Sequence, residues 1–308
     1  MESIVRARNL RKRFGEIEAV AGLSFEVRRG EVFGLIGPDG AGKSTTLRIL
    51  AGLLGADAGT AEVAGVDVLA DPEAVKPRIG YMPQQFSLYG DLTVEENLRF
   101  FASMFFVPRK ERAARFARLY EFSRLGPFTK RRAEALSGGM QKKLALSCVL
   151  IHSPDLLLLD EPTTGVDPVS RRELWDMLYR LVHDGLSILV STPYMDEAER
   201  CHRVGLMHEG RMMRMDAPHA VRDAMDATLL ALHGPDVHRI VRALRDDPRI
   251  ASAYPAGQVV HAVLAPGQGD PAGVAAALTA RFAEVERAEP IRPTFEDAFI
   301  RLVEKERR

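Results

Sequence analysis

The sequence predicts an α/β fold, with a second, smaller α+β domain at the C-terminal end. A glycine-rich loop joins an apolar run at 31–36 to a segment of helical character at 43–50. Further along, four consecutive leucines at 156–159 are typical of a parallel strand that is buried on both faces. After residue 226 the pattern changes to short alternating strands and helices. These observations indicate a parallel sheet flanked by helices, followed by a separate domain.

The loop between the first strand and helix fits the pattern G-x-x-x-x-G-K-[ST] (Walker A). Its glycines let backbone N–H groups turn toward a polyphosphate, and the helix N-terminus adds partial positive charge. Lys43 is expected to reach the β- and γ-phosphates, and the Ser44 hydroxyl to bind Mg²⁺. A glycine-rich turn with a chance lysine is the alternative, but it does not account for the strand and the helix on either side. The residues expected to contact the nucleotide here are Gly37, Pro38, Asp39, Gly40, Ala41, Gly42, Lys43, Ser44 and Thr45.

Two acidic residues, Asp160 and Glu161, follow the leucine run. Asp160 is placed to hold Mg²⁺ through water, and Glu161 is the candidate general base that polarises the attacking water. An exposed acid pair at a strand end is the alternative, which the buried strand argues against. Asp167 before Pro168 also makes a good helix start, with Asp as N-cap and Pro at the first helical position.

A second glycine motif, Ser137-Gly138-Gly139, stands directly before a helical segment at 140–150. The free amides of that helix start could bind an anion, or the motif could simply cap the helix. Because one bound nucleotide already has a helix start at its phosphates, the second is best explained by another nucleotide.

In this order, the phosphate loop, the segment Leu136-Ser-Gly-Gly-Met-Gln141 and the acidic strand end resemble the ATPase subunit of an ABC transporter. The resemblance covers roughly the first two thirds of the chain. It implies ATP and Mg²⁺ as cofactors and a dimer, of two identical or two homologous subunits, that encloses two ATP molecules head to tail. Each ATP would lie between the phosphate loop of one chain and Ser137, Gly138 and Gly139 of the other.

The same resemblance assigns further residues. Phe14 matches the aromatic residue that stacks on adenine, although it could equally be a core aromatic. Gln84, with Gln85 beside it, matches the glutamine that touches Mg²⁺ and senses the γ-phosphate. The apolar segment 86–92 matches the groove that receives a helix of an integral membrane permease, and 163–167 matches the dimer-contacting loop. A capping box beginning at Thr93 then opens a helix.

One position departs from the family pattern. Where the family has a histidine after a strand, this chain has Pro193. Proline has no donor and no titratable group, so it cannot contact the γ-phosphate as an imidazole does. His202 is nearest in sequence, but we expect it inside a helix that begins near Asp196. The prediction is slow hydrolysis at this chain's own phosphate loop, or hydrolysis that depends mainly on Glu161.

Composition narrows the class of protein. Over 308 residues the Lys+Arg and Asp+Glu counts are both 42, so there is no overall positive field and no nucleic-acid partner is expected. The apolar runs are shorter than the ~20 residues that a membrane helix needs, and the N-terminus lacks a signal-peptide core. The chain is therefore expected to be cytoplasmic, and the resemblance implies that it is peripheral on the cytoplasmic face of the cell membrane. Cys148 and Cys201 are expected in helices, as buried or half-buried free thiols.

The expected organisation is a nucleotide-binding domain at 1–226, with a helical subdomain at about 89–153, and an accessory or regulatory domain at 227–308. In the latter, the order β-α-β-β-α-β predicts a ferredoxin-like unit with an added helix. The predicted strands are 228–232, 250–254, 258–264 and 285–288, and the predicted helices are 236–245, 271–282 and 294–303. Its tail at 293–299 looks like that of ATPases in the drug-exporter branch, where an extension is thought to support dimerisation or regulation.

Three functions remain open. The first is an ATPase that powers transport, with export favoured, through a partner permease. The second is a regulatory subunit, weakened by Pro193 and paired with an active homologue. The third is a non-transport ABC ATPase acting in translation or DNA repair, which the zero net charge and the apolar 86–92 segment disfavour. A GTPase or small-molecule kinase would leave the 136–141 motif unexplained.

Overall fold

The computed structural model describes residues 2–85, 88–225 and 227–306, and the chain forms two compact units, Met1–Pro218 and His219–Arg308. The boundary that we expect after residue 226 stays a prediction. Within the described ranges, no helix combines the length and the apolar character needed to span a membrane.

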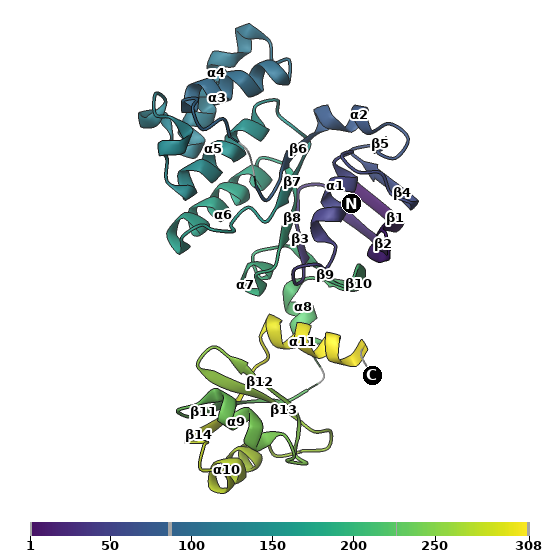
Figure 1. The fold of residues 1–308 in the computed structure, drawn as a ribbon, viewed down its shortest axis with the longest axis vertical. Coiled ribbons are helices and arrows are strands. Elements are labelled where there is room, and N and C mark those ends of the chain that lie inside the picture. Colours follow the sequence, from purple (N-terminus) through teal and green to yellow (C-terminus); the bar gives the residue numbers. More distant parts are fainter. Residues whose placement is uncertain (1, 86–87, 226, 307–308) are drawn as a thin grey trace. The chain divides into compact units, whose positions relative to one another are not determined.

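The first unit contains a mostly parallel sheet of order β10-β9-β3-β8-β7-β6 (Figure 1). Its strands are β3 Val32–Ile36, β6 Ile79–Met82, β7 Leu156–Asp160, β8 Ser187–Thr192, β9 Arg203–His208 and β10 Arg211–Asp216. Every neighbouring pair is parallel except β9 and β10, which form a hairpin. The four leucines of β7 are completely buried, as a strand covered on both faces requires. The predicted strands at 31–36 and 156–159 are therefore confirmed.

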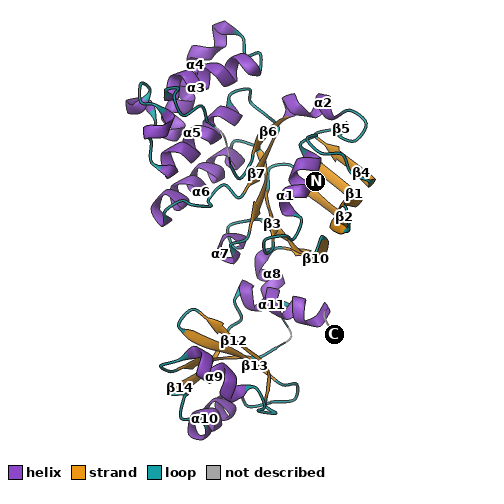
Figure 2. Ribbon diagram, in the orientation of Figure 1, coloured by secondary structure: helices purple, strands orange, loops and turns teal. Residues whose placement is uncertain are grey.

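A second, antiparallel sheet has the order β2-β1-β4-β5, and helix α1, Lys43–Leu50, lies between the two sheets (Figure 2). Its strands are β1 Ser3–Phe14, β2 Ile17–Arg28, β4 Ala58–Val63 and β5 Val66–Asp67. Apolar residues of α1 join one buried cluster with residues of both sheets, so the helix that follows the phosphate loop is fixed on two sides. The short helices α2 Pro72–Val75 and η1 Lys76–Arg78 lead into β6.

Helices α3, α4 and α5 form a group with its own apolar core beside the parallel sheet (Figure 1). This group comprises α3 Val94–Met104, α4 Arg109–Ser123, η2 Gly126–Phe128, η3 Ala133–Ala135 and α5 Gly138–Leu150. The predicted capping box is present at the start of α3, where Thr93 and Glu96 bond each other's backbone N–H groups. The core holds Cys148, which is a buried free thiol as predicted.

The remaining helices of the first unit follow β7 and β8. Asp167 caps α6, Pro168–His183, through the N–H groups of Val169 and Ser170, which confirms the predicted helix start. Helix α7 covers only Met195–Ala198, so the prediction that Cys201 and His202 lie in a helix is wrong. The helix ends early because His202 bonds strand β3 instead. The N–H of His202 donates to the carbonyl oxygen of Val32, and the N–H of Val32 donates to Nδ1 of His202. Cys201 is nevertheless a buried free thiol.

The second unit has a sheet of order β12-β13-β11-β14 in which all neighbours are antiparallel. Its elements, after α8 Pro218–Asp223, are β11 Leu229–His233, α9 Val237–Leu244, β12 Ile250–Ala256, β13 Val259–Leu264, α10 Pro271–Arg281, β14 Arg287–Ile291 and α11 Phe295–Glu306. This order and pairing are those of the predicted ferredoxin-like unit with an added helix. The last strand begins two residues later than predicted, because Val285 lies in a turn closed by the carbonyl of Phe282.

Candidate nucleotide-binding site

The phosphate loop holds its shape through glycines that no other residue could replace without strain. Gly40 and Gly42 have φ of +80° and +96°, in the left-handed region that L side chains rarely adopt. A Cβ atom at Gly37 would lie 2.2 Å from the carbonyl oxygen of Met207, and one at Gly42 would lie 2.1 Å from that of Ala19. The loop therefore packs backbone against backbone on β2 and β9 before the start of α1.

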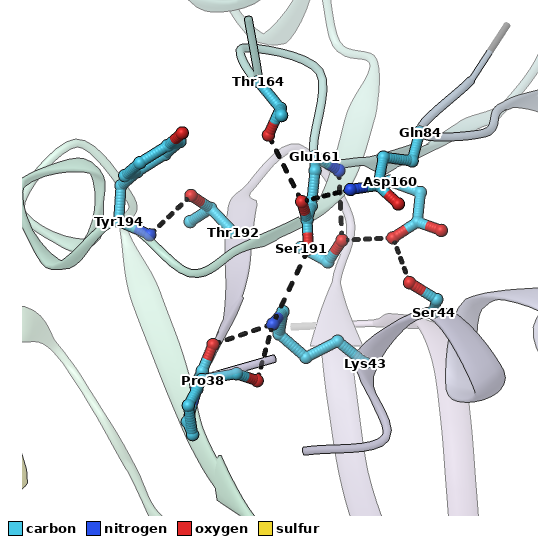
Figure 3. A network of polar contacts seen from close by, with 11 residues as sticks. Pro38, Lys43, Ser44, Gln84, Asp160, Glu161, Thr164, Ser191, Thr192 and Tyr194 are labelled. Atoms are coloured by element: carbon cyan, nitrogen blue, oxygen red, sulfur yellow. Dashed lines mark hydrogen bonds and ion pairs between the residues drawn. The ribbon is translucent and has the colours of Figure 1, made fainter. Parts of the chain in front are cut away.

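Lys43 is the first residue of α1, and its side chain is 4% exposed. The ammonium donates hydrogen bonds to the carbonyl oxygens of Gly37 and Pro38, at 2.7 and 2.9 Å (Figure 3). It also lies 3.7 Å from Oε1 of Glu161. Burial lowers the pKa of Lys43, although the nearby carboxylates oppose that shift. The loop thus places a buried cation at its own centre.

Asp160 ends β7 and is 1% exposed. Its Oδ1 accepts hydrogen bonds from the hydroxyls of Ser44, at 2.8 Å, and Ser191, at 2.6 Å (Figure 3). Side chains from the end of β8 and from the start of α1 therefore meet the carboxylate that ends β7. Carboxylate and hydroxyl oxygens are hard ligands of the kind Mg²⁺ prefers, so the donor set fits that ion.

Glu161, the next residue, is 6% exposed and has φ of +49°, which is unusual for a residue with a side chain. Its N–H donates to the carbonyl oxygen of Ser191, which fixes this backbone. Its Oε2 accepts hydrogen bonds from Nε2 of Gln84, at 2.8 Å, and from the hydroxyl of Thr164, at 3.2 Å (Figure 3). The carboxylate is therefore contacted from the segment after β6, from the segment after β7 and from the first residue of α1.

The sequence did not mark Ser191 or Lys142 as site residues, and it placed Thr164 only in the predicted dimer-contacting loop. Ser191 bonds both Asp160 and the backbone of Glu161, and Lys142 donates to the carbonyl oxygen of Gln84 at 3.1 Å. Ser191 stands at the carboxyl end of a buried run next to Thr192, which is where polar residues of a parallel sheet meet. That position could have marked Ser191, whereas nothing in the sequence pairs Lys142 with Gln84.

Pro193 lies in the turn directly after β8. The turn is closed by the N–H of Tyr194, which donates to the hydroxyl of Thr192 at 3.0 Å (Figure 3). The ring of Tyr194 packs under the guanidinium of Arg171, 4.5 Å from the ring centre. Arg171 also lies 3.8 Å from the fully buried carboxylate of Glu197. Helix α6 and this turn are thus held together without an imidazole at position 193.

The second glycine motif is at the start of α5, as predicted. Ser137 is the N-cap, and its hydroxyl accepts from the N–H of Met140 at 3.4 Å. Gly139 packs on α6, where a Cβ would lie 2.3 Å from the hydroxyl of Ser170. Across the described ranges, no hydrogen bond or ion pair joins Ser137, Gly138 or Gly139 to the phosphate loop. A cleft of about 440 Å³ adjoins Gly138 and is lined as well by Lys142 and Gly165.

The remaining predicted residues have clear positions. Phe14 is 50% exposed, so the alternative hypothesis that it is a core aromatic is wrong. The ammonium of Lys12 lies 5.7 Å from the centre of the Phe14 ring. Gln84 and Gln85 are both exposed residues, and the side chain of Gln84 contacts Glu161. Phe86, at the start of the predicted docking segment, lies outside the described residues, and Tyr89 within that segment is 45% exposed.

A parallel sheet with a glycine-rich loop before α1, and with acids at the end of β7, defines a phosphate-binding-loop nucleotide-binding protein. Residues 20–164 match the family model described as ABC transporter. The chain is 42% identical over 306 residues to the probable multidrug ABC transporter ATP-binding protein YbhF of Escherichia coli (strain K12), covering 98% of this chain and 52% of that protein. The chain thus spans about half the length of that relative.

Other relatives agree in class. The chain is 42% identical to the Nod factor export ATP-binding protein I of Burkholderia orbicola (strain AU 1054), with 78% of each protein covered. Among solved structures, an ATP-binding subunit of an ABC transporter matches with a TM-score of 0.65 and 29% identity, over 72% of this chain and 92% of that one. A dimeric, post-hydrolysis ATP-binding cassette bound to ADP and Pi matches with a TM-score of 0.62 and 27% identity, over 69% and 98%. The chain belongs to the family of ABC transporter ATP-binding subunits.

Proposed function

We propose that this chain binds and hydrolyses ATP with Mg²⁺, as one subunit of a dimer that powers export through a partner permease. The observation that carries the proposal is the convergence of Lys43, Ser44, Gln84, Asp160 and Glu161 at the carboxyl ends of the parallel strands. Each residue type there suits phosphoryl transfer to water, in which catalysis rests on positioning and on charge stabilisation.

Lys43 would bind the β- and γ-phosphates by giving up its present contacts with protein oxygens. In the present structure its ammonium is bonded to the carbonyl oxygens of Gly37 and Pro38 and paired with Glu161. Phosphate oxygens carry full charge and make stronger hydrogen bonds to an ammonium than peptide carbonyls do. The exchange would also release Oε1 of Glu161 from the lysine, so nucleotide binding prepares the base.

Glu161 would then orient the attacking water and accept its proton. Gln84 and Thr164 hold Oε2, which leaves Oε1 as the oxygen that can face a water molecule. A general base needs a partner within hydrogen-bond reach and a fixed orientation, and the backbone of Glu161 is fixed by Ser191. Ser44, Asp160 and Gln84 would hold Mg²⁺. Bound there, the ion would neutralise charge that develops on the phosphate oxygens.

The start of α5 would complete the site of a second subunit. Ser137, Gly138 and Gly139 make no polar contact with their own phosphate loop across the described residues, and Ser137 and Gly138 are exposed. Their backbone N–H groups at a helix N-terminus suit a γ-phosphate. A similar cassette with ADP and Pi is dimeric, which supports the same assembly here. Phe14, half exposed beside Lys12, would stack on the adenine.

The permease would dock on the exposed apolar side of the α3 region, near the predicted segment 86–92. Tyr89, Phe100 and Met104 are 45%, 39% and 47% exposed, and the rings of Tyr89 and Phe100 are in edge contact. An apolar surface of this kind favours a protein partner. The chain would then be peripheral on the cytoplasmic face of the membrane. Export is favoured because two relatives are named for multidrug transport and for Nod factor export.

A regulatory subunit is the second candidate, and Pro193 favours it. The turn after β8 offers the hydroxyl of Thr192 and the ring of Tyr194, with no imidazole at position 193. Such a chain would bind ATP at its own loop and complete the site of an active homologue through Ser137, Gly138 and Gly139.

Turnover of the purified chain separates these two functions. We expect magnesium-dependent release of phosphate from ATP by the chain alone, and loss of that release in Glu161→Gln. If the chain binds ATP and turns over no faster than Glu161→Gln, the regulatory function is favoured. Co-purification with the membrane subunit then identifies the permease and allows the same measurement on the complex.

A further inference from the structure

The turn between α3 and α4 presents one aromatic side chain almost entirely to solvent. Phe106 is 90% exposed, the highest value among the large exposed hydrophobic residues of the described chain. Single exposed apolar residues are ordinary, but this one also has φ of +54°, in the left-handed region that glycine favours. Phe106 therefore has a strained backbone conformation that a glycine would adopt without strain.

The exposed position of Phe106 is built by the residues around it. The N–H of Phe106 donates to the carbonyl oxygen of Ser103, and Val107 beside it is buried and anchors the turn. Arg112 bonds the carbonyl oxygen of Val107 and the hydroxyl of Ser103, both at 2.9 Å. Because several hydrogen bonds fix the backbone of this turn, the ring is kept at the surface of the chain.

Helix α4 continues this surface with cations and small residues. On its exposed face, Lys110, Ala114 and Arg118 follow one another at intervals of one helical turn. Arg109 lies next to Lys110 at the start of the helix. Within the described ranges, these three cations have no acidic partner. The exposed alanines between them are Ala113, Ala114 and Ala117.

Two of these cations also stand where helix electrostatics disfavours them. Arg109 and Lys110 are the first two residues of α4, at the end that carries partial positive charge, and the N-cap Pro108 provides no side-chain bond. Glu111 also lies in this first turn, but its carboxylate pairs with Arg115 at 2.9 Å, so Arg109 and Lys110 remain without an acidic partner there. The turn thus combines an exposed aromatic ring with cations that lack partners.

We infer that Phe106, Arg109, Lys110 and Arg118 form a surface that binds the anionic headgroups of a lipid bilayer. The phenylalanine would enter the boundary between headgroups and acyl chains, and the cations would pair with lipid phosphates. A bilayer can accept a projecting ring beside a face of cations and small alanines without a matching pocket. The surface is two residues from Met104, so it continues the side that would face the permease under the proposed function.

Vesicle flotation with the full-length chain tests this inference and does not depend on ATP turnover. We expect the chain to float with vesicles of phosphatidylcholine and phosphatidylglycerol at low salt, and not with phosphatidylcholine alone. Raising the salt concentration should release it, because screening weakens the attraction between the cations and the membrane. Failure to float with either kind of vesicle, in a chain that binds ATP, would overturn the inference while leaving the proposed function intact.

Two variants identify the residues responsible. Phe106→Gly removes the ring and relieves the left-handed strain, so its melting temperature should not fall while its vesicle binding weakens by roughly tenfold. The double variant Arg109→Gln with Lys110→Gln should weaken binding by roughly 30-fold, since each cation near an anionic surface contributes about a factor of five.

Matched controls separate local effects from general ones. Leu53→Ser removes another exposed apolar side chain, and Arg242→Gln with Arg245→Gln removes the same charge from the end of helix α9 and its C-cap. Both should float as the unmodified chain does. If the Phe106 and Arg109/Lys110 variants float unchanged, or if they lose only co-purification with the permease, the surface is not a lipid contact and the inference is wrong.

Discussion

Two buried carboxylates, Glu161 in the first unit and Asp297 in the second, differ in how completely their oxygens are hydrogen-bonded. Asp297 is 1% exposed, and each of its oxygens accepts two hydrogen bonds. Oδ1 accepts from Tyr254 and His261, both at 2.7 Å, and Oδ2 accepts from the N–H and the hydroxyl of Thr294, at 2.6 and 2.7 Å. These partners tie the start of α11 to strands β12 and β13.

Glu161 has fewer and looser partners. Only Oε2 accepts short hydrogen bonds, while Oε1 faces Lys43 at 3.7 Å and the backbone is left-handed. A carboxylate with all its acceptor sites filled fixes a structure, because moving it would leave several buried donors unpaired. A carboxylate with one oxygen held only by a long ion pair, on a strained backbone, suits chemistry. The comparison predicts that changes at Glu161 alter turnover and that changes at Asp297 alter stability.

The largest expected effect is on turnover. Glu161→Gln keeps the shape and the contact with Gln84 but cannot take a proton, so kcat for ATP should fall by at least about 100-fold. Binding of a fluorescent ATP analogue and the melting temperature should change little. Phosphate release within a few fold of the unmodified chain would show that Glu161 is not the base.

The second effect is on folding. Asp297→Ala leaves the buried groups of Tyr254, His261 and Thr294 without their acceptor, which should cost about 3 kcal/mol in the free energy of unfolding. Urea unfolding followed by circular dichroism measures this loss. Asp236→Ala, which removes the exposed N-cap of α9, is the control and should cost about 1 kcal/mol. Equal losses in the two variants would contradict a special role for the Asp297 network.

The pH dependence of unfolding sharpens the same contrast. Burial alone would raise the pKa of Asp297, but hydrogen bonds from His261, Thr294 and Tyr254 outweigh it and lower the pKa to about 2. Since the unfolded value is about 3.9, the ionised carboxylate stabilises the fold above that pH, by about 2 kcal/mol. The stabilisation should be lost as the pH falls from about 4 toward 2. In Asp297→Asn this part of the pH dependence should disappear, which thermal melts across that range would detect.

The smallest effect concerns Pro193. In Pro193→His an imidazole could donate toward the γ-phosphate, so turnover should rise by roughly tenfold. The gain should require Glu161, so the double variant Pro193→His with Glu161→Gln should remain inactive. If Pro193→His gives no gain while Glu161→Gln abolishes turnover in both backgrounds, a histidine is dispensable at this site.

Much of the fold could be predicted because its signals are local. The pattern of apolar residues and the glycine spacing predict β3, the loop and α1, and side-chain caps predict the starts of α3 and α6. The end of α7 could not be predicted in this way. The local sequence after Ala198 is compatible with a longer helix, but the hydrogen bonds between His202 and Val32 hold this segment against β3. Because those two residues are far apart in the sequence, no local pattern indicates the contact.

The sequence alone determined the family resemblance, the order of the elements and the residue types of the candidate site, since motif spacing and hydrophobic period are written along the chain. Tertiary structure decided which atoms meet. It brought Ser191 to Asp160, turned Gln84 toward Glu161, and placed the left-handed turn that carries Phe106 on the surface. The physical reason is that these contacts join segments separated by many residues, and only the packing of strands and helices sets their distances.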